Sequence, residues 1–101
     1  MAKESIIQKN IIDFCKHIGA LPIKTIVCNE SGFPDLIIPL PNGITAYIEA
    51  KTPDGKPTAL QTLRNKQLTE RNQPAIIAYS FEEAKDFLLK ISNIPPLCKV
   101  Y

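Results

Sequence analysis

The sequence lacks the features of a membrane or secreted protein. No apolar run approaches the roughly 20 residues that a membrane-spanning helix needs. Residues 1–10 contain no apolar region of the kind that a signal peptide carries. With 45% apolar and 22% charged residues, the composition is that of an ordinary folded protein. We therefore expect a cytoplasmic protein without a membrane partner.

Cysteine and histidine are also scarce. The three cysteines, Cys15, Cys28 and Cys98, are widely separated and form no Cys-x-x-Cys pair. This pattern favours a reducing compartment and argues against a zinc site. The single histidine, His17, falls near the end of a predicted helix, where a cation suits the helix dipole. We expect neither the thiols nor His17 to take part in chemistry.

The net charge of +2 is small, but it is unevenly distributed. Residues 51–73 contain five basic and two acidic side chains, whereas residues 1–50 have a net charge of −1 and residues 74–101 are neutral. A local basic excess indicates an anionic partner. A solvated helix face is an equally ordinary explanation.

A length of 101 residues suits one domain with a modest core, which we expect to span residues 1–101. Apolar spacing predicts a helix, three strands, a helix, a strand and a helix, at residues 3–18, 22–28, 35–38, 44–50, 58–71, 75–79 and 80–91. The two later helices each begin with a capping-box pattern, at 58–61 and 80–83. This order predicts an antiparallel meander and then a crossover to a parallel strand, in an α/β/α sandwich.

The turn of the predicted hairpin, LPNGI at 40–44, fixes the pairing of its strands. Its Pro-Asn pair suits a type I turn, and Gly43 suits the left-handed position of a G1 bulge. A three-residue loop of this kind places Asp35 directly opposite Glu49 on the same face of the hairpin.

Two directly opposed carboxylates destabilise a hairpin unless a cation compensates for their charge. Lys51 lies on the same face, because it is two residues after Glu49. A divalent cation such as Mg²⁺, which prefers carboxylate oxygens, would compensate better. The alternative is a twisted strand end at which Asp35, Glu49 and Lys51 spread into solvent.

These residues resemble the motif of the PD-(D/E)xK nuclease superfamily. Pro34-Asp35 matches the PD element, and Glu49-Ala50-Lys51 matches the ExK element. With Gly32 before the PD element, Glu4 in the first helix and Gln61 in the helix after the ExK strand, the chain is most similar to the small stand-alone VRR-NUC domains typical of bacteriophages. The similarity covers residues 4 to about 90.

This resemblance implies a restriction-endonuclease-like fold, with a mixed sheet and the core order αβββαβ(α). It also implies a Mg²⁺- or Mn²⁺-dependent endonuclease that hydrolyses DNA, in the cytoplasm of a bacterial host if the gene belongs to a phage. Asp35 and Glu49 would hold the metal with the backbone carbonyl of Ala50, and Lys51 would orient or deprotonate the attacking water. Glu4 would be a further ligand, although an acid in a first helical turn also suits the helix dipole.

Three further side chains are candidates for the site. Gln61 would contact Lys51, a water or a phosphate, although its place in the capping box explains it equally well. Gln8 follows Glu4 by one helical turn and faces the same way. Lys56, in the loop after the ExK strand, is a candidate phosphate contact, although a loop lysine is often simply solvated.

Members of this family that consist of one domain tend to act as dimers. We therefore expect a homodimer that prefers branched or Holliday-junction-like DNA, with the apolar tail 94–101 either at the dimer contact or packed on its own sheet. A catalytically silent module that binds DNA or a protein is one alternative, and an RNA-processing nuclease is another.

Overall fold

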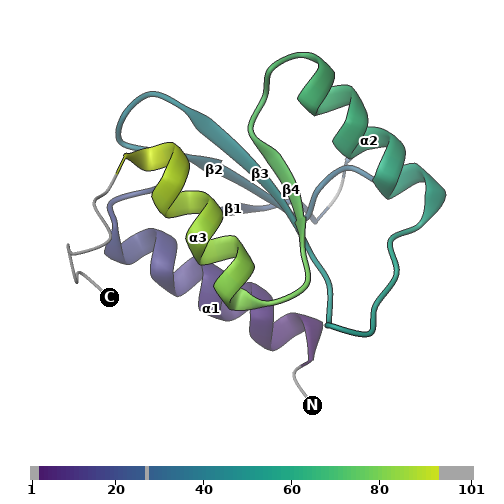
Figure 1. Ribbon diagram of the computed structural model, residues 1–101, viewed down its shortest axis with the longest axis horizontal. Helices are drawn as coiled ribbons and strands as arrows, with labels where there is room; N and C mark the ends of the chain where they lie inside the picture. The colour runs from purple at the N-terminus through teal and green to yellow at the C-terminus, as the bar shows by residue number, and fades with distance from the viewer. Residues whose placement is uncertain (1–2, 27, 94–101) are drawn as a thin grey trace.

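The structure, a computed structural model, describes residues 3–26 and 28–93. Its elements follow the predicted order: α1 (Glu4–His17), β1 (Ile23–Lys24), β2 (Leu36–Pro39), β3 (Thr45–Ala50), α2 (Ala59–Glu70), β4 (Ala75–Ala78) and α3 (Phe81–Ser92) (Figure 1). The tail 94–101, with Cys98, lies outside the described residues. Within the described part of the chain, no helix has the length and apolar character needed to cross a bilayer.

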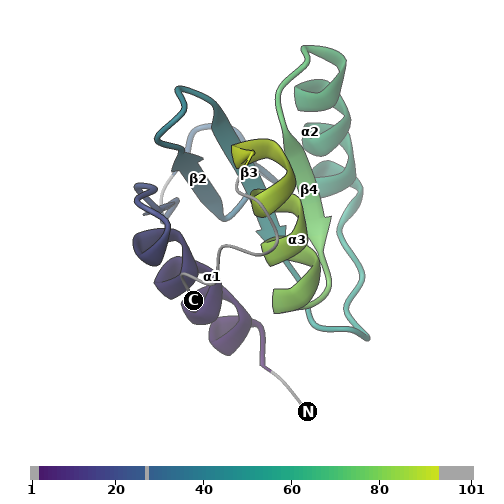
Figure 2. The same cartoon turned by 60° about the vertical axis from the view of Figure 1, so that its left-hand side comes forward.

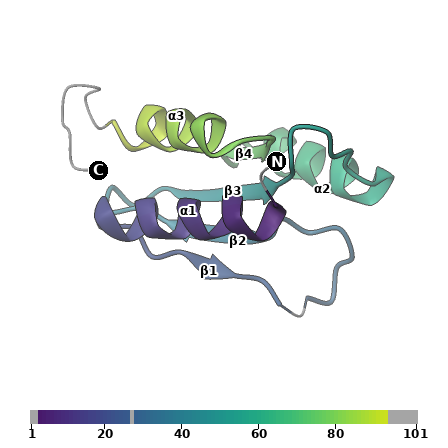
Figure 3. The same cartoon turned by 90° about the horizontal axis from the view of Figure 1, so that it is seen from below.

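The four strands form one mixed sheet in the order β1-β2-β3-β4 (Figure 3). Antiparallel pairs join β1 to β2 and β2 to β3, and β4 is parallel to β3. The predicted meander and crossover are therefore confirmed. The prediction of a strand over 22–28 was too long, because the ladder holds only Ile23 and Lys24. Both side chains are exposed on an edge strand, so little burial favours a longer pairing.

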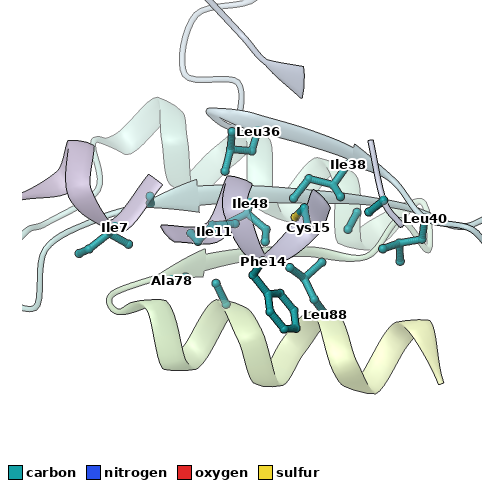
Figure 4. Packing of buried hydrophobic residues seen from close by; sticks show 14 residues of the cluster. Ile7, Ile11, Phe14, Cys15, Leu36, Ile38, Leu40, Ile48, Ala78 and Leu88 are labelled. Atoms are coloured by element: carbon teal, nitrogen blue, oxygen red, sulfur yellow. The ribbon is translucent and has the colours of Figure 1, made fainter. Parts of the chain in front are cut away.

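The core lies between one face of the sheet and the pair α1 and α3. Ile11 and Phe14 of α1 and Leu88 of α3 are almost fully buried, as are Leu36 and Ile48 of the strands (Figure 4). Buried residues recur at every second position of these strands, because every second side chain of a strand faces the same side of the sheet. α2 contributes no buried residue and contacts β4 from the side opposite α3 (Figure 2). Because α2 buries none of its residues, the face of the sheet on which α2 lies has room for polar groups.

The hairpin has the predicted turn and register. Leu40 N donates to Ile44 O at 2.7 Å, and Gly43 N donates to Leu40 O at 3.1 Å. Gly43 takes the left-handed conformation, with φ of +88°. Along the strands the pairing includes Leu36 opposite Ile48, which is the predicted register. Asp35 directly precedes the paired part of β2.

The helix caps confirm one prediction and correct another. At α2 the full capping box is present, with the Thr58 side chain accepting from Gln61 N and the Gln61 side chain accepting from Thr58 N. At α3 the Ser80 side chain accepts from Glu83 N, as predicted. The other half of the predicted capping box, in which the Glu83 side chain would accept from Ser80 N, is wrong, because Glu83 Oε1 accepts from Tyr79 N at 2.9 Å. That contact satisfies a backbone donor directly after β4.

Candidate functional site

Three carboxylates from three different elements meet at one end of the sheet. Each of Glu4, Asp35 and Glu49 offers an oxygen that lies within 4.8 Å of the others. Glu4 begins α1, Asp35 immediately precedes β2, and Glu49 is the next-to-last residue of β3. The structure therefore brings together all three carboxylates that the sequence pattern selected.

Asp35 is fixed by the backbone of β3. Its Oδ2 accepts from Ala50 N at 3.2 Å. The backbone groups of Tyr47 and Lys51 donate towards β4, so the alternation along the strand directs Ala50 towards β2. The N–H and the carbonyl of Ala50 therefore both point to the side of β3 on which Asp35 lies.

Glu49 is the buried member of the cluster, with an exposed fraction of 3%. The alternative in which this side chain spreads into solvent is therefore wrong. Its Oε2 accepts from Gln61 Nε2 at 3.1 Å and lies 3.8 Å from Lys51 Nζ. No residue in the described part of the chain donates a hydrogen bond to its Oε1. A buried acceptor without a donor is costly, which points to a cation as the missing partner.

The electrostatics of Glu49 lead to the same conclusion. Burial first, and then the charge of the neighbouring Asp35 and a hydrogen bond that the protonated Glu49 carboxyl makes with the Asp35 side chain, raise the pKa of Glu49 from 4.5 to about 8. Lys51 lowers this pKa in part, and Glu4 raises it further. Without another positive charge, the site therefore favours a protonated Glu49 at neutral pH.

Gln61 makes the capping contact that the sequence offered and, in addition, a contact with the carboxylate cluster. Its Oε1 accepts from Thr58 N at 2.9 Å in the capping box, while its Nε2 donates to Glu49. The contact expected with Lys51 is replaced by this contact with the carboxylate. Because one planar amide makes both hydrogen bonds, the first turn of α2 is positioned relative to β3.

The loop before Asp35 packs closely on α2. Gly32 has φ of +79°, and a Cβ at this position would lie 2.7 Å from the Cβ and the carbonyl carbon of Leu60. Arg64 holds the same loop, since its Nε donates to Ser31 O at 2.9 Å and its Nη2 to Glu30 Oε2 at 3.0 Å. Sequence reasoning missed Arg64, because no local pattern links residues 33 positions apart.

The remaining candidates lie apart from these contacts. Gln8 is buried, with an exposed fraction of 8%, and within 3–26 and 28–93 no hydrogen bond joins it to a carboxylate of the cluster. Lys56 is exposed in the loop between β3 and α2. Burial raises the pKa of the Cys15 thiol to about 12, which agrees with an inert thiol, and Cys28 is free and exposed.

The donor set fits a hard divalent cation. Mg²⁺ takes oxygen ligands, usually one or two carboxylates together with waters, and Mn²⁺ accepts the same donors. Glu4, Asp35 and Glu49 supply such oxygens, and the unpartnered Glu49 Oε1 is one for which the described residues provide no donor. Imidazole and thiol groups, which would favour zinc, are absent from this cluster.

Comparison with known proteins gives similar chains among both curated proteins and solved structures, although no family model matches. "Putative nuclease p44" of Acyrthosiphon pisum secondary endosymbiont phage 1 is 29% identical over 77 residues, which cover 76% of this chain and 83% of that protein. A solved structure described as "VRR_NUC domain" matches with a TM-score of 0.78 and 26% identity. This match covers 89% of this chain and 97% of the other. The residues at the sheet end, the fold and these similarities agree with the family resemblance of the sequence: the chain has the restriction-endonuclease-like fold of a VRR-NUC domain.

Proposed function

We propose that this domain is a Mg²⁺- or Mn²⁺-dependent endonuclease that hydrolyses phosphodiester bonds in DNA. The observation that carries the proposal is the cluster of Glu4, Asp35 and Glu49, with ligand oxygens within 4.8 Å of one another. The name of the phage relative, which describes a nuclease, supports the same activity. Each residue of the motif then has a distinct task.

Asp35, Glu49 and Glu4 would hold the cation, together with the backbone carbonyl of Ala50. A divalent metal at this position supplies Lewis acidity to the scissile phosphate and lowers the pKa of a bound water. The hydrogen bond from Ala50 N keeps the Asp35 carboxylate directed towards β3. Gln61 keeps Oε2 of Glu49 in place and leaves Oε1, to which no described residue donates, available as a ligand atom that would take a cation.

Lys51 acts on the water and the phosphate. Its Nζ lies 3.8 Å from Glu49 Oε2, and its side chain is only 13% exposed. The ammonium group of Lys51, held at this position, orients the attacking water and offsets the charge that develops on the phosphate oxygens. Lys56, in the exposed loop that follows, would contact a neighbouring phosphate, and Gln8 remains a candidate contact one turn after Glu4.

The substrate that we propose is branched or junction DNA, bound by a homodimer. The edge of the sheet supports the dimer, because Leu21, Ile23 and Ile26 are 61%, 43% and 84% exposed along β1 and its flanks. An edge strand with exposed apolar side chains is a ready surface for a second copy of the chain. A two-fold pair would place two sites on one branched substrate. Light scattering in solution tests the mass, and a single-chain mass would remove this part of the proposal.

The activity is tested by incubating the protein with labelled duplex, single-stranded and four-way-junction DNA in Mg²⁺, in Mn²⁺ and in EDTA. We expect cleavage with either metal, most rapid on the junction, and none in EDTA. Asp54→Asn serves as the control variant, since Asp54 is an exposed acid of the loop after β3 and lies outside the cluster. Binding without cleavage in both metals would favour a silent module. A labelled single-stranded RNA is included as a further substrate, and cleavage of this RNA alone would favour the RNA-processing alternative.

A further inference from the structure

A recess of about 300 Å³ lies between α2 and the loop that precedes β2. Its lining consists of Glu30, Phe33, Arg64, Gln67, Leu68 and Arg71. Phe33 is two residues before Asp35, and Arg64 follows Gln61 by about one helical turn. The recess is therefore built on the same loop and the same helix that position the metal site, but it shares no residue with the cluster.

We propose that this recess takes one unpaired base of the substrate strand, next to the phosphate that is cut; the proposal rests on the nuclease function above. Phe33 supplies the aromatic surface, since bases stack on aromatic side chains in single-stranded nucleic acid recognition. The ring is held by an edge-to-face contact with Tyr47, at a centroid distance of 6.0 Å and an angle of 90°. A fixed ring loses little freedom when a base stacks on it.

Arg64 provides a second planar surface rather than a phosphate ligand. Its guanidinium already donates to Ser31 O, Glu30 Oε2 and Gln67 Oε1, at 2.9 to 3.0 Å. The ion pair with Glu30 largely compensates its charge, so a phosphate would have to displace that carboxylate. A guanidinium plane held in this way can still stack on a base.

Gln67 and Arg71 provide the polar contacts. The Oε1 atom of Gln67 accepts from Arg64, which directs the amide so that its NH₂ group remains a donor for a base oxygen or ring nitrogen. Arg71 is exposed at the rim, and its Nη1 donates to the carbonyl of Gln67 in its own helix. Among the described residues this guanidinium makes no other hydrogen bond, so its remaining donors are available to the phosphate attached to a bound base.

The size of the recess explains why the base must be unpaired. A volume of about 300 Å³ is at the lower end for sites that hold small molecules, so it admits one base but not a base pair. A base in a duplex can enter such a site only after it leaves the stack, and this step costs least where the base is already unpaired. The recess would therefore select DNA with an unpaired nucleotide beside the cleavage position, as at a branch point.

The test uses junction DNA in which 2-aminopurine replaces each base near the branch in turn, with the protein in EDTA so that no cleavage occurs. We expect the fluorescence to change on binding at one position and not at its neighbours. An abasic site at that position should then weaken binding by roughly 5- to 150-fold, the range for loss of one stacked base. In Phe33→Leu, which removes the aromatic face but keeps an apolar side chain, the abasic site should have little further effect.

Arg71→Gln should weaken binding of intact and abasic DNA by the same factor, because it removes a phosphate contact. Lys66→Gln, which removes an exposed positive charge from the same helix, is the matched control and should leave the effect of the abasic site unchanged. Thermal melting verifies that each variant is folded. If Phe33→Leu does not fold, the proposal is decided by the binding of intact and abasic DNA to the unmodified protein alone.

The proposal is overturned if DNA binds without a fluorescence change at any position, or if the abasic site weakens binding less than about twofold. In that case metal-dependent cleavage by the same protein would leave the nuclease function standing. Conversely, a position-specific fluorescence change without cleavage in Mg²⁺ or Mn²⁺ would support the base site and contradict the nuclease.

Discussion

The side-chain amide of Gln61 joins the first turn of α2 to the buried carboxylate of Glu49. Its oxygen completes the cap of the helix, and its NH₂ group donates to Glu49 Oε2 at 3.1 Å. The cap and the site therefore depend on one side chain, and substitutions can separate the two roles.

Gln61→Ala should reduce both stability and activity, because it removes the hydrogen bonds of the Gln61 side chain with Thr58 N and Glu49 Oε2. We expect a loss of about 1 kcal/mol in the free energy of unfolding, the usual size for a lost hydrogen bond. Gln61→Glu keeps an acceptor for Thr58 N, as in the common form of the capping box, but places a carboxylate against Glu49. This variant should remain near the original stability and still cut more slowly. Urea unfolding and cleavage rates measure the two effects, and equal rates for Gln61→Glu and the unmodified protein would show that the contact with Glu49 has no role.

Glu49→Gln should change the pH dependence of stability in the absence of metal. The pKa of Glu49 is raised from 4.5 to about 8 on folding, so the folded chain retains a proton that the unfolded chain releases. Stability should therefore fall as the pH rises from about 4.5 to about 8, and the variant should lack this part of the decrease. Urea midpoints in EDTA at pH 5 and pH 8 measure the difference. A decrease that is equally steep in both proteins would mean that Glu49 is ionised in the folded state throughout this range.

Lys51→Ala should lower the cleavage rate more than it lowers DNA affinity. The side chain is 13% exposed and lies beside Glu49, where it acts on charge that develops during the reaction. A loss of roughly 100- to 1000-fold in kcat is the scale for one such electrostatic group. Single-turnover rates at saturating protein, together with binding in Ca²⁺, separate the two quantities. A loss confined to affinity would make Lys51 a phosphate anchor.

Gly32→Ala should be far more damaging than Gly43→Ala, although both glycines have positive φ, at +79° and +88°. At Gly43 a Cβ meets nothing within 4 Å, so the cost should be only the backbone strain of about 1–2 kcal/mol. At Gly32 the Cβ would also lie 2.7 Å from atoms of Leu60. To relieve this clash, the loop before Asp35 must move away from α2. Melting temperatures and cleavage rates at a temperature where both variants are folded test this difference. Similar losses in both variants would contradict a role for the close packing of Gly32 on α2.

Much of the site could be predicted because residues close together in the sequence determine its geometry. The turn at 40–44 sets the hairpin register, and the register places Asp35 opposite Glu49. The burial of Glu49 could not be predicted in this way, because it depends on where α2 packs. The hydrogen bond from Arg64 to Ser31 O could not be predicted either, since it links residues far apart in the chain.

The errors in the predicted fold also have a tertiary origin. The β-rich composition of residues 22–28 favoured a long strand, but an edge position leaves only Ile23 and Lys24 in the ladder. At α3, Glu83 matched the capping pattern, yet its carboxylate reaches Tyr79 N at the end of β4. In both cases the position of a neighbouring strand decided the outcome, and no local pattern carries that information.

The central claim is that Glu4, Asp35 and Glu49 hold the divalent cation on which DNA cleavage depends. It is tested most directly by the cleavage rate of a labelled four-way junction across a Mn²⁺ titration, for the unmodified protein and for Glu49→Gln. The account predicts a rate that rises to saturation for the unmodified protein and no cleavage by the variant at any Mn²⁺ concentration, with both proteins folded. Cleavage by Glu49→Gln at the unmodified rate, or cleavage by the unmodified protein in EDTA, would contradict it.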